Sequence, residues 1–310
     1  MKGLQLSNFK QLVDQLPAKT NLQLIATTHS TTKESVYSGR MVAFKPYEGL
    51  VHLASDIVKF CTDGKEPLLS KGSVAQRYDG SGKEGLLSYL DITDPLVGKS
   101  WTAFSSAMSN VSREQSPSAQ KISATVLTSV ERDFFLVSIQ TPILSFNQRR
   151  LFWGKESFSE IGDGISILTF TPRLDAIVFR EKIVFLSSRG ASFFVSESAV
   201  LRKARETASR IAKMNIVSNI EEFMKAAEVP RNAHWLIAVD EKRLENISKG
   251  KIREHVSEVF GLKYSKGQFS TSTRGEIAAL LKVLGKRGML DVVENIPVEV
   301  SGSGDWKVEA

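Results

Sequence analysis

The sequence has 310 residues, of which 42% are hydrophobic and 24% charged, and its formal net charge is +7. This composition is typical of a globular protein with one large or two ordinary domains, and the positive charge favours nucleic acid or another anionic partner. The single cysteine, Cys61, excludes an internal disulfide and a zinc site built on several thiolates, and no run of 18 apolar residues predicts a membrane span.

The single cysteine also indicates a reducing compartment, so we expect a cytoplasmic protein. Cys61 follows a stretch with helical apolar spacing, LVHLASDIVKF, which predicts a buried and inert thiol. The N-terminal stretch MKGLQLSNFKQLVDQLP has no long uncharged apolar core and predicts an amphipathic helix instead of a signal peptide. Any association with a membrane would therefore need a partner protein.

The first half of the chain predicts a mixture of helices and strands. Asp94 as N-cap and Pro95 at the first helical position open a helix through KSWTAFSSAMSNV. KISATVLTSV and DFFLVSIQTPI predict a hairpin, and the alternation within KISATVLTSV indicates one solvent-facing side. The other predicted elements are strands over LQLIATT (22–28), SVYSGRMVAF (35–44) and LLSYLDI (86–92), and a helix over residues 48–62.

The second half predicts short strands followed by helices. HWLIAV (234–239) is compatible with a strand or a buried helix, and KIREHVSEVFG is a helix with Gly261 as its C-cap. The remaining predicted elements are the strand ISILTF (165–170), a hairpin within residues 173–189, helices over 198–215 and 219–229, a hairpin over 262–272, a helix over 274–295 that Gly285 and Gly288 could break, and a strand over 296–302.

Grouped strands and grouped helices predict an α+β fold with mixed or antiparallel sheets and packed helices. Polar stretches at residues 110–121 and 154–164 are typical of loops. We therefore expect two loosely separated halves, an N-terminal α+β domain over residues 1–155 and a C-terminal α+β domain over residues 156–310.

The hairpin RLDAIVFREKIVFLSSR (173–189) has two unusual features. Alternation places Asp175 on one face with Ile177 and Phe179, so it is either a strand-edge group near solvent or a residue held by a specific partner. Arg180-Glu181 stands at the turn without the usual glycine, so we expect a loop longer than two residues and correspondingly shorter strands.

Most enzyme motifs are absent from the sequence. A phosphate loop at DGSGKEG (79–85) fails because Arg77 and Glu84 stand where glycine and serine or threonine are required. The four histidines are scattered, and no serine-hydrolase GxSxG motif occurs. The sequence therefore predicts neither a cofactor nor a metal site, and we expect a protein that is not an enzyme.

One catalytic hypothesis stays open. A metal-dependent nuclease needs acidic residues from neighbouring strands to hold Mg²⁺ and a lysine near the scissile phosphate. Asp240-Glu241-Lys242 has this acid–any–lysine pattern, and Asp175 is the candidate for the distant acid. The alternative interpretation is that Asp240 is the N-cap of a helix with Glu241 in its first turn.

Basic residues cluster on two predicted helices. At about 100° per residue, those of the helix over 198–215 share one arc, opposite an apolar arc. Such clusters can contact phosphates with salt-sensitive, sequence-independent affinity, or they can be solvated faces balanced by nearby glutamates. The candidate DNA-contact residues are Arg202, Lys203, Arg205, Arg210, Lys213, Lys249, Lys251 and Arg253.

The order of elements in residues 165–310 resembles the KwaB family, the soluble component of the two-gene Kiwa anti-phage defence system. The resemblance rests on RLDAIVFREKIVFLSSRGASFFV, the helix that follows, and the run from KIREHVSEVFG to IPVEV. It implies a bacterial cytoplasmic protein that is recruited to the inner membrane by a small membrane protein, KwaA. It also implies binding to duplex DNA of the invading phage, which blocks its replication and late transcription. The resemblance supplies no site residues.

Three hypotheses remain open at this point. The first is a non-enzymatic DNA-binding defence protein, which we expect to be a homodimer. The second is a metal-dependent nuclease that uses Asp175, Asp240 and Lys242. The third is an interaction module whose basic faces bind an acidic protein or a membrane surface.

Overall fold

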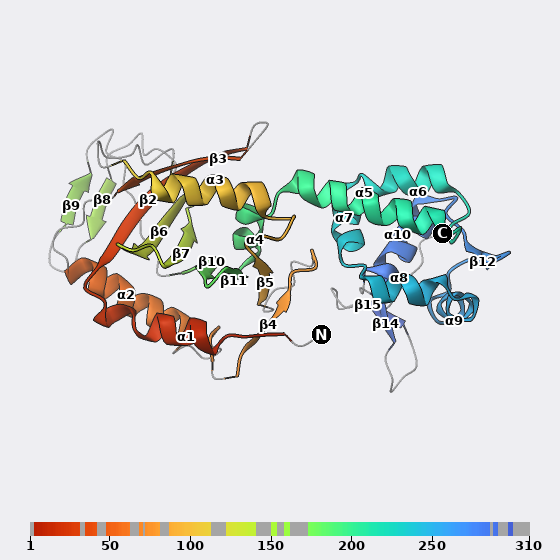
Figure 1. Cartoon of the computed structure of the whole chain (residues 1–310), viewed down its shortest axis with the longest axis horizontal. Helices are drawn as coiled ribbons and strands as arrows, with labels where there is room; N and C mark the ends of the chain where they lie inside the picture. The colour runs from red at the N-terminus through yellow and green to blue at the C-terminus, as the bar shows by residue number, and fades with distance from the viewer. Residues whose placement is uncertain are drawn as a thin grey trace. The chain divides into compact units, whose positions relative to one another are not determined.

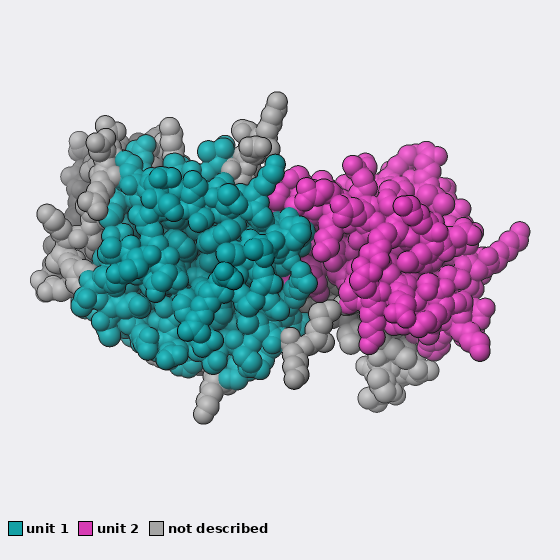
Figure 2. Space-filling view, viewed as in Figure 1, with its two compact units in different colours: residues 1–77, 84–194 teal, residues 78–83, 195–310 magenta. Residues whose placement is uncertain are grey.

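The computed structural model describes residues 3–31, 35–41, 48–62, 68–70, 72–80, 87–112, 122–140, 150–153, 158–161, 173–285, 288–290 and 297–299. These residues form ten α-helices, a mixed nine-stranded sheet and three two-stranded sheets, which confirms the predicted α+β class. The chain has two compact units, here called unit 1 (residues 1–77 and 84–194) and unit 2 (residues 78–83 and 195–310) (Figure 2).

The division between the units does not coincide with the predicted domain boundary. The prediction placed the boundary between residues 155 and 156, which lie outside the described residues. The two compact units divide between Phe194 and Val195, and the short segment 78–83 belongs to unit 2 although it lies within the sequence of unit 1. The hairpin at 173–189 is therefore part of unit 1.

Unit 1 is built on the nine-stranded sheet (Figure 1). Neighbouring strands are antiparallel, except that β4 and β5 are parallel. In spatial order the strands are β1 (Leu4–Gln5), β4 (Val74–Arg77), β5 (Ser88–Asp91), β11 (Lys182–Phe185), β10 (Ala176–Phe179), β7 (Phe134–Ile139), β6 (Ala124–Ser129), β2 (Leu22–Thr31) and β3 (Ser35–Met41). A separate pair is formed by β8 (Arg150–Trp153) and β9 (Phe158–Ile161).

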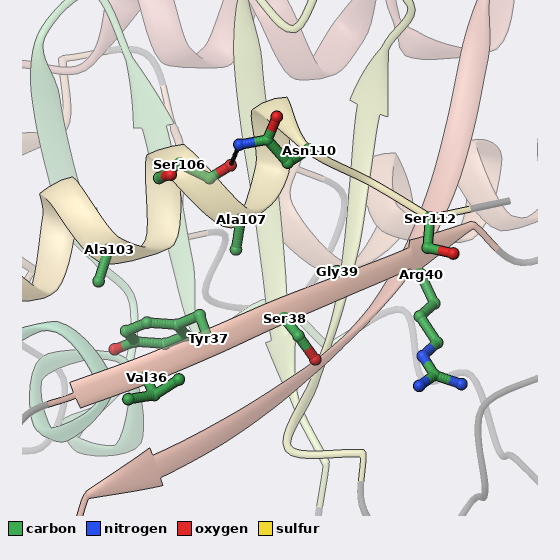
Figure 3. A pocket seen from close by; sticks show the side chains of 10 residues that line it. All are labelled: Val36, Tyr37, Ser38, Gly39, Arg40, Ala103, Ser106, Ala107, Asn110 and Ser112. Atoms are coloured by element: carbon green, nitrogen blue, oxygen red, sulfur yellow. Dashed lines mark hydrogen bonds between the residues drawn. The ribbon is translucent and has the colours of Figure 1, made fainter. Parts of the chain in front are cut away.

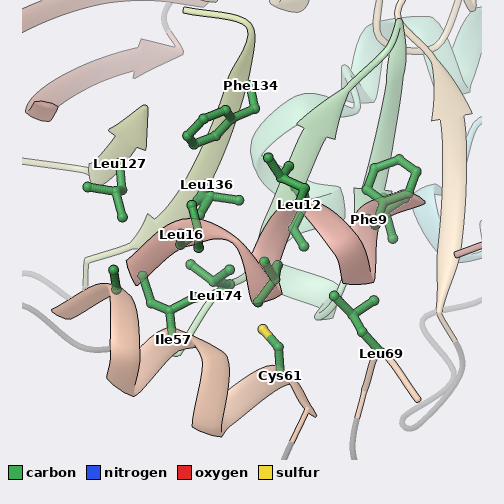
Figure 4. Close-up of a cluster of buried hydrophobic side chains, with 14 of the residues drawn as sticks. Phe9, Leu12, Leu16, Ile57, Cys61, Leu69, Leu127, Phe134, Leu136 and Leu174 are labelled. Atoms are coloured by element: carbon green, nitrogen blue, oxygen red, sulfur yellow. The ribbon is translucent and has the colours of Figure 1, made fainter. Parts of the chain in front are cut away.

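Helices cover both faces of the sheet. On one face α1 (Ser7–Asp14), the 3-10 helix Leu16–Ala18 and α2 (Glu48–Thr62) pack over alternate strand residues such as Phe134 and Leu136 (Figure 4). On the other face α3 (Gly98–Ser109) and α4 (Ser188–Phe194) contribute an aromatic cluster. Cys61 lies in the first of these cores, where burial raises the pKa of its thiol to about 12, as expected for an inert cysteine.

This double cover contradicts the solvent-facing side predicted for KISATVLTSV. All six residues of β6 are buried. The polar ones are accommodated by hydrogen bonds: Thr128 donates to the carbonyl of Phe134, and Thr125 donates to the carbonyl of Ser138 at 3.5 Å. The prediction was wrong because alternation can only indicate a wet face when the second face has no helix to cover it.

The hairpin β10–β11 is tighter than predicted. Phe179 pairs with Lys182, so the turn contains only Arg180 and Glu181. Both have positive φ, 49° and 62°, which is the geometry of a type I′ turn. The prediction of a longer loop was wrong because two non-glycine residues here adopt the left-handed conformation, at a cost of roughly 1–2 kcal/mol each.

The helix predicted to begin at Asp94 starts later. Helix α3 begins at Gly98, and Asp94 instead organises the turn before it. The Asp94 carboxylate accepts hydrogen bonds from the backbone N–H of Leu96 at 3.0 Å and from the guanidinium of Arg77 at 2.5 Å. The aspartate therefore caps the turn that precedes the helix, and it ties this turn to β4.

Unit 2 is mainly helical (Figure 1). The first four residues of HWLIAV, His234–Ile237, lie in helix α7, which agrees with the helical one of the two predicted alternatives, and Pro230 is in the first turn of this helix. The described elements are α5 (Glu197–Lys213), α6 (Ile220–Ala227), α7 (Pro230–Ile237), α8 (Glu241–Ser248), α9 (Gly250–Phe260), the hairpin β12 (Tyr264–Ser265) and β13 (Gln268–Phe269), α10 (Arg274–Leu284), and the pair β14 (Gly288–Leu290) and β15 (Pro297–Glu299).

Local end signals account for several of these helices. Asp240 caps α8, Gly261 ends α9 with φ of 60°, and Thr273 with Glu276 forms a capping box at the start of α10. Helix α10 ends at Leu284, where Gly285 was predicted to break it, but residues 288–290 form a strand and not more helix. Local signals therefore mark the starts of α8 and α10 and the end of α9.

Gly80, in the segment 78–83, packs on α7. Gly80 has φ of 79°, and a Cβ atom at this position would lie 2.6 Å from the carbonyl oxygen of His234 and 3.0 Å from Ile237 Cδ1. Only glycine allows this approach without displacement of α7. The segment is thus an integral part of unit 2.

Candidate nucleic-acid interface

Helix α5 carries five of the eight candidate DNA-contact residues and is amphipathic, as predicted. Its inner face packs on α6 and α7. Along its outer face Arg202 and Lys213 lie almost in line, about 16 Å apart at 1.5 Å per residue. The buried residues of the helix are Ala199, Val200, Ala204, Thr207, Ala208 and Ile211.

Two of the five basic residues of α5 pair with glutamates. Arg205 lies 2.8 Å from Glu228, and Arg210 makes a bidentate pair with Glu241, which lowers the pKa of that carboxyl group through the hydrogen bond. The glutamate side chains are 58% and 78% exposed, so water competes with both ion pairs. Sequence reasoning missed these pairs because the partners lie 23 and 31 residues away.

The other three basic residues of α5 have no acidic partner among the described residues. These are Arg202, Lys203 and Lys213, of which the first and last are exposed. Glu206 lies on the same face of the helix, so five cations stand against three carboxylates and the face keeps a net charge of +2. The face is therefore basic, but less so than the sequence of α5 alone indicates.

Two of the three basic residues in the second predicted cluster make contacts within unit 2, at the start of α9. Lys249 precedes α9 and lies 3.7 Å from Glu245. Arg253 donates a hydrogen bond to the Ser248 carbonyl at 3.2 Å and approaches the Tyr264 hydroxyl at 3.5 Å. Lys251 is exposed and has no acidic partner in the part of the chain that the structure describes. Of the three candidate residues in this cluster, only Lys251 is therefore an exposed cation that has neither an acidic partner nor a hydrogen bond among the described residues.

Asp175 is a buried residue whose carboxylate is held by hydrogen bonds and an ion pair within unit 1. It is fully buried in unit 1. Its Oδ2 accepts a hydrogen bond from the backbone N–H of Ile139 at 2.8 Å, and its Oδ1 accepts one from the Ser187 hydroxyl and lies 3.2 Å from the Arg189 guanidinium. Of the two predicted environments for Asp175, the structure therefore has the one with specific partners.

The other two candidate nuclease residues lie in unit 2. The Asp240 carboxylate accepts a hydrogen bond from the backbone N–H of Arg243 at 2.9 Å, as the capping interpretation predicted. Lys242 is exposed in the first turn of α8. Within the described ranges no group of three or more His, Cys, Asp or Glu residues is arranged to hold a metal ion. Asp175 and Asp240 thus have structural hydrogen-bonding roles, and Lys242 is an exposed side chain of α8.

Unit 1 contains a pocket that sequence reasoning did not identify (Figure 3). It has a volume of about 690 Å³ and lies between the edge strand β3 and helix α3. The abundance of small residues in TAFSSAMSN was the available signal, since they leave space on that side of α3. The lining residues are Val36, Tyr37, Ser38, Gly39, Arg40, Ala103, Ser106, Ala107, Asn110 and Ser112.

Tyr37, on the inner wall of this pocket, is held by a hydrogen bond and by ring stacking. The Tyr37 hydroxyl donates a hydrogen bond to the Phe193 carbonyl at 2.9 Å, and its ring stacks on His29 at 4.2 Å. Burial raises the pKa of Tyr37 and lowers the pKa of His29, so both side chains are neutral at pH 7. The charge in the pocket therefore comes from Arg40.

Comparisons of the chain with protein-family models, with curated proteins and with solved structures find no match. Among the described residues, no helix has the length and apolar character needed to cross a membrane.

Proposed function

We propose that this protein is a non-enzymatic DNA-binding protein that contacts duplex DNA through the outer face of α5. The observation that supports the proposal is a set of three cations on the outer arc of α5 that lack acidic partners among the described residues: Arg202 and Lys213, which are exposed, and Lys203, which is half-buried. Lysine and arginine that neutralise phosphates release counterions, which gives affinity without sequence preference. A face of about 16 Å is long enough to meet several phosphates of a duplex.

The glutamates beside α5 fit a role as competitors of phosphate. Glu228 and Glu241 hold Arg205 and Arg210 in exposed ion pairs that water weakens. A DNA phosphate that approaches the face can exchange with these carboxylates, and the exchange costs part of the gain. We therefore propose modest affinity at physiological salt and a steep loss of binding as salt increases.

The resemblance to the KwaB family extends the proposal to a biological setting. In that setting the protein is a cytoplasmic homodimer that acts with the membrane protein KwaA, engages invading phage DNA, and blocks its replication and late transcription. In this proposal KwaA supplies the attachment to the membrane; no helix among the described residues is long and apolar enough to cross one. Co-purification with a co-expressed KwaA protein tests this part separately from DNA binding.

A salt titration of DNA binding tests the proposal. Fluorescence anisotropy with a labelled 30-base-pair duplex gives the slope of log K against log salt for the wild type and for the triple variant Arg202→Ala, Lys203→Ala, Lys213→Ala. Loss of three phosphate contacts makes this negative slope shallower by about 2–3. The matched control is Lys225→Ala, an exposed lysine of unit 2 that already pairs with Glu221 at 2.8 Å. Equal affinity and slope for the triple variant and the wild type refute the proposed face.

The same materials address the alternatives. Incubation of supercoiled plasmid with protein and Mg²⁺ or Mn²⁺ reports nuclease activity, which Lys242→Ala abolishes if the nuclease hypothesis is correct. Flotation with anionic vesicles reports binding to a membrane surface. Vesicle binding without duplex binding identifies the basic face as a membrane contact and refutes the DNA proposal.

A further inference from the structure

The outer edge of β3 presents backbone groups that no strand pairs within the described residues. β3 is the last strand of the nine-stranded sheet. The Gly39 carbonyl accepts a hydrogen bond from Ser112 N–H at 3.2 Å, and Met41 N–H donates to the Ser112 carbonyl at 3.0 Å. The backbone groups of residues 39 and 41 therefore point away from β2. Because direction alternates along a strand, those of Tyr37 also point outward.

The chain itself shows that this edge accepts an added strand. Ser112 forms a parallel bridge with Arg40, which is one step of a parallel ladder. The next position of that ladder lies opposite Ser38, between the Tyr37 carbonyl and the Gly39 N–H. The chain cannot occupy it, because Asn110 and the residues before it end α3. The pocket of about 690 Å³ lies at this vacant position.

The side chains around the edge define what would fit. Towards α3 the wall consists of Ala103, Ser106 and Ala107, which leave room for an apolar side chain (Figure 3). On the other face of β3 are Val36, 58% exposed, and Arg40, which has no acidic partner in the described part of the chain. Native edge strands are commonly protected by proline or by several charges, and residues 35–41 contain one charge and no proline.

We propose that the β3–α3 groove binds an extended peptide of a partner protein by strand addition to β3. The peptide residue opposite Ser38 donates its N–H to the Tyr37 carbonyl and accepts from the Gly39 N–H. Its side chain is on the Arg40 face, diagonal to Arg40 and within reach of a long side chain. Charge complementarity to Arg40 makes this residue acidic. Its neighbour points towards the small residues of α3, so we expect it to be apolar. Main-chain hydrogen bonds supply affinity and the two side chains supply specificity.

The test uses a defined probe. A fluorescein-labelled heptapeptide that alternates valine with glutamate is titrated with the full chain and followed by anisotropy. We expect saturable binding, and at least about tenfold weaker binding of the matched peptide with lysine in place of glutamate, as the loss of one charge-assisted hydrogen bond predicts. The variant Arg40→Glu reverses this preference.

A second pair of variants distinguishes a blocked groove from a loss of folding. Ser106→Trp fills the groove from an exposed position and is expected to weaken binding at least about tenfold, whereas Thr102→Trp, exposed on the same helix but outside the groove, leaves it unchanged. Circular dichroism melts confirm that both variants fold. Binding that neither Arg40→Glu nor Ser106→Trp alters overturns the proposal. A wild-type dimer that Ser106→Trp converts to a monomer also overturns it, since the occupant is then a second copy of this chain.

Discussion

Replacement of Asp175 by alanine should destabilise unit 1 strongly, although the residue belongs to neither proposed contact surface. The carboxylate is fully buried and joins β7, through Ile139, to Ser187 and Arg189 at the start of α4. Asp175→Ala leaves the Ile139 N–H and the Ser187 hydroxyl without an acceptor. Arg189 is 43% exposed, so water can solvate its charge after the substitution.

The expected loss follows from these partners. A buried donor that loses its acceptor costs roughly 1–3 kcal/mol. Ile139 and Ser187 are partly buried, so the lower half of this range applies to each, and together they predict a decrease of about 3 kcal/mol in the free energy of unfolding. Asp175→Asn retains one acceptor oxygen and should cost about half as much. Arg189→Ala removes only a partly exposed ion pair and should cost less than about 1 kcal/mol.

Urea titrations at pH 7, followed by circular dichroism, measure these differences from the midpoint and slope of each transition. The order of the three variants is the informative result, because a merely electrostatic role for Asp175 would make Arg189→Ala as costly as Asp175→Ala. An Asp175→Ala variant within about 0.5 kcal/mol of the wild type would refute the reasoning.

Three further predictions concern single positions. Glu181→Gly should stabilise the protein by about 1 kcal/mol, because glycine relieves the positive φ in the hairpin turn; a lower melting temperature contradicts this. Gly190→Ala should cost at least about 2 kcal/mol, because its Cβ would lie 2.0 Å from the Asp175 carbonyl; an unchanged urea midpoint contradicts it. Glu276 is desolvated, which raises its pKa, but hydrogen bonds from Lys263, Ser270, Thr273 and Ser272 outweigh this and hold it at about 2. Its stabilising effect relative to Glu276→Gln should be complete above pH 4.5 and lost as pH falls to about 2, and a pH-independent difference in melts refutes it.

Elements whose signals lie within a few residues could be predicted from the sequence. The N-cap Asp240, the C-cap Gly261 and the hairpin pairs follow from local backbone chemistry, and all are present in the structure. The amphipathic arc of α5 is predictable for the same reason, because helical periodicity alone decides which residues can face the core.

Features that depend on distant residues could not be predicted. The buried polar face of β6 depends on helices from other parts of the chain, and the partial neutralisation of α5 depends on Glu228 and Glu241. The burial of Asp175 depends on a backbone donor 36 residues earlier, at Ile139. In each case local alternation or charge counting was sound, but the partner that decided the environment was not adjacent in sequence.

The position of segment 78–83 has a consequence for how the chain can be dissected. The polypeptide passes between the two units at residues 77/78, 83/84 and 194/195. Cleavage after Phe194 therefore leaves Tyr78 and Gly80 covalently attached to the larger fragment while Gly80 remains packed on α7 of the smaller one. The two fragments should stay associated through a limited digestion, and a recombinant fragment that starts at Val195 lacks one of its own structural pieces.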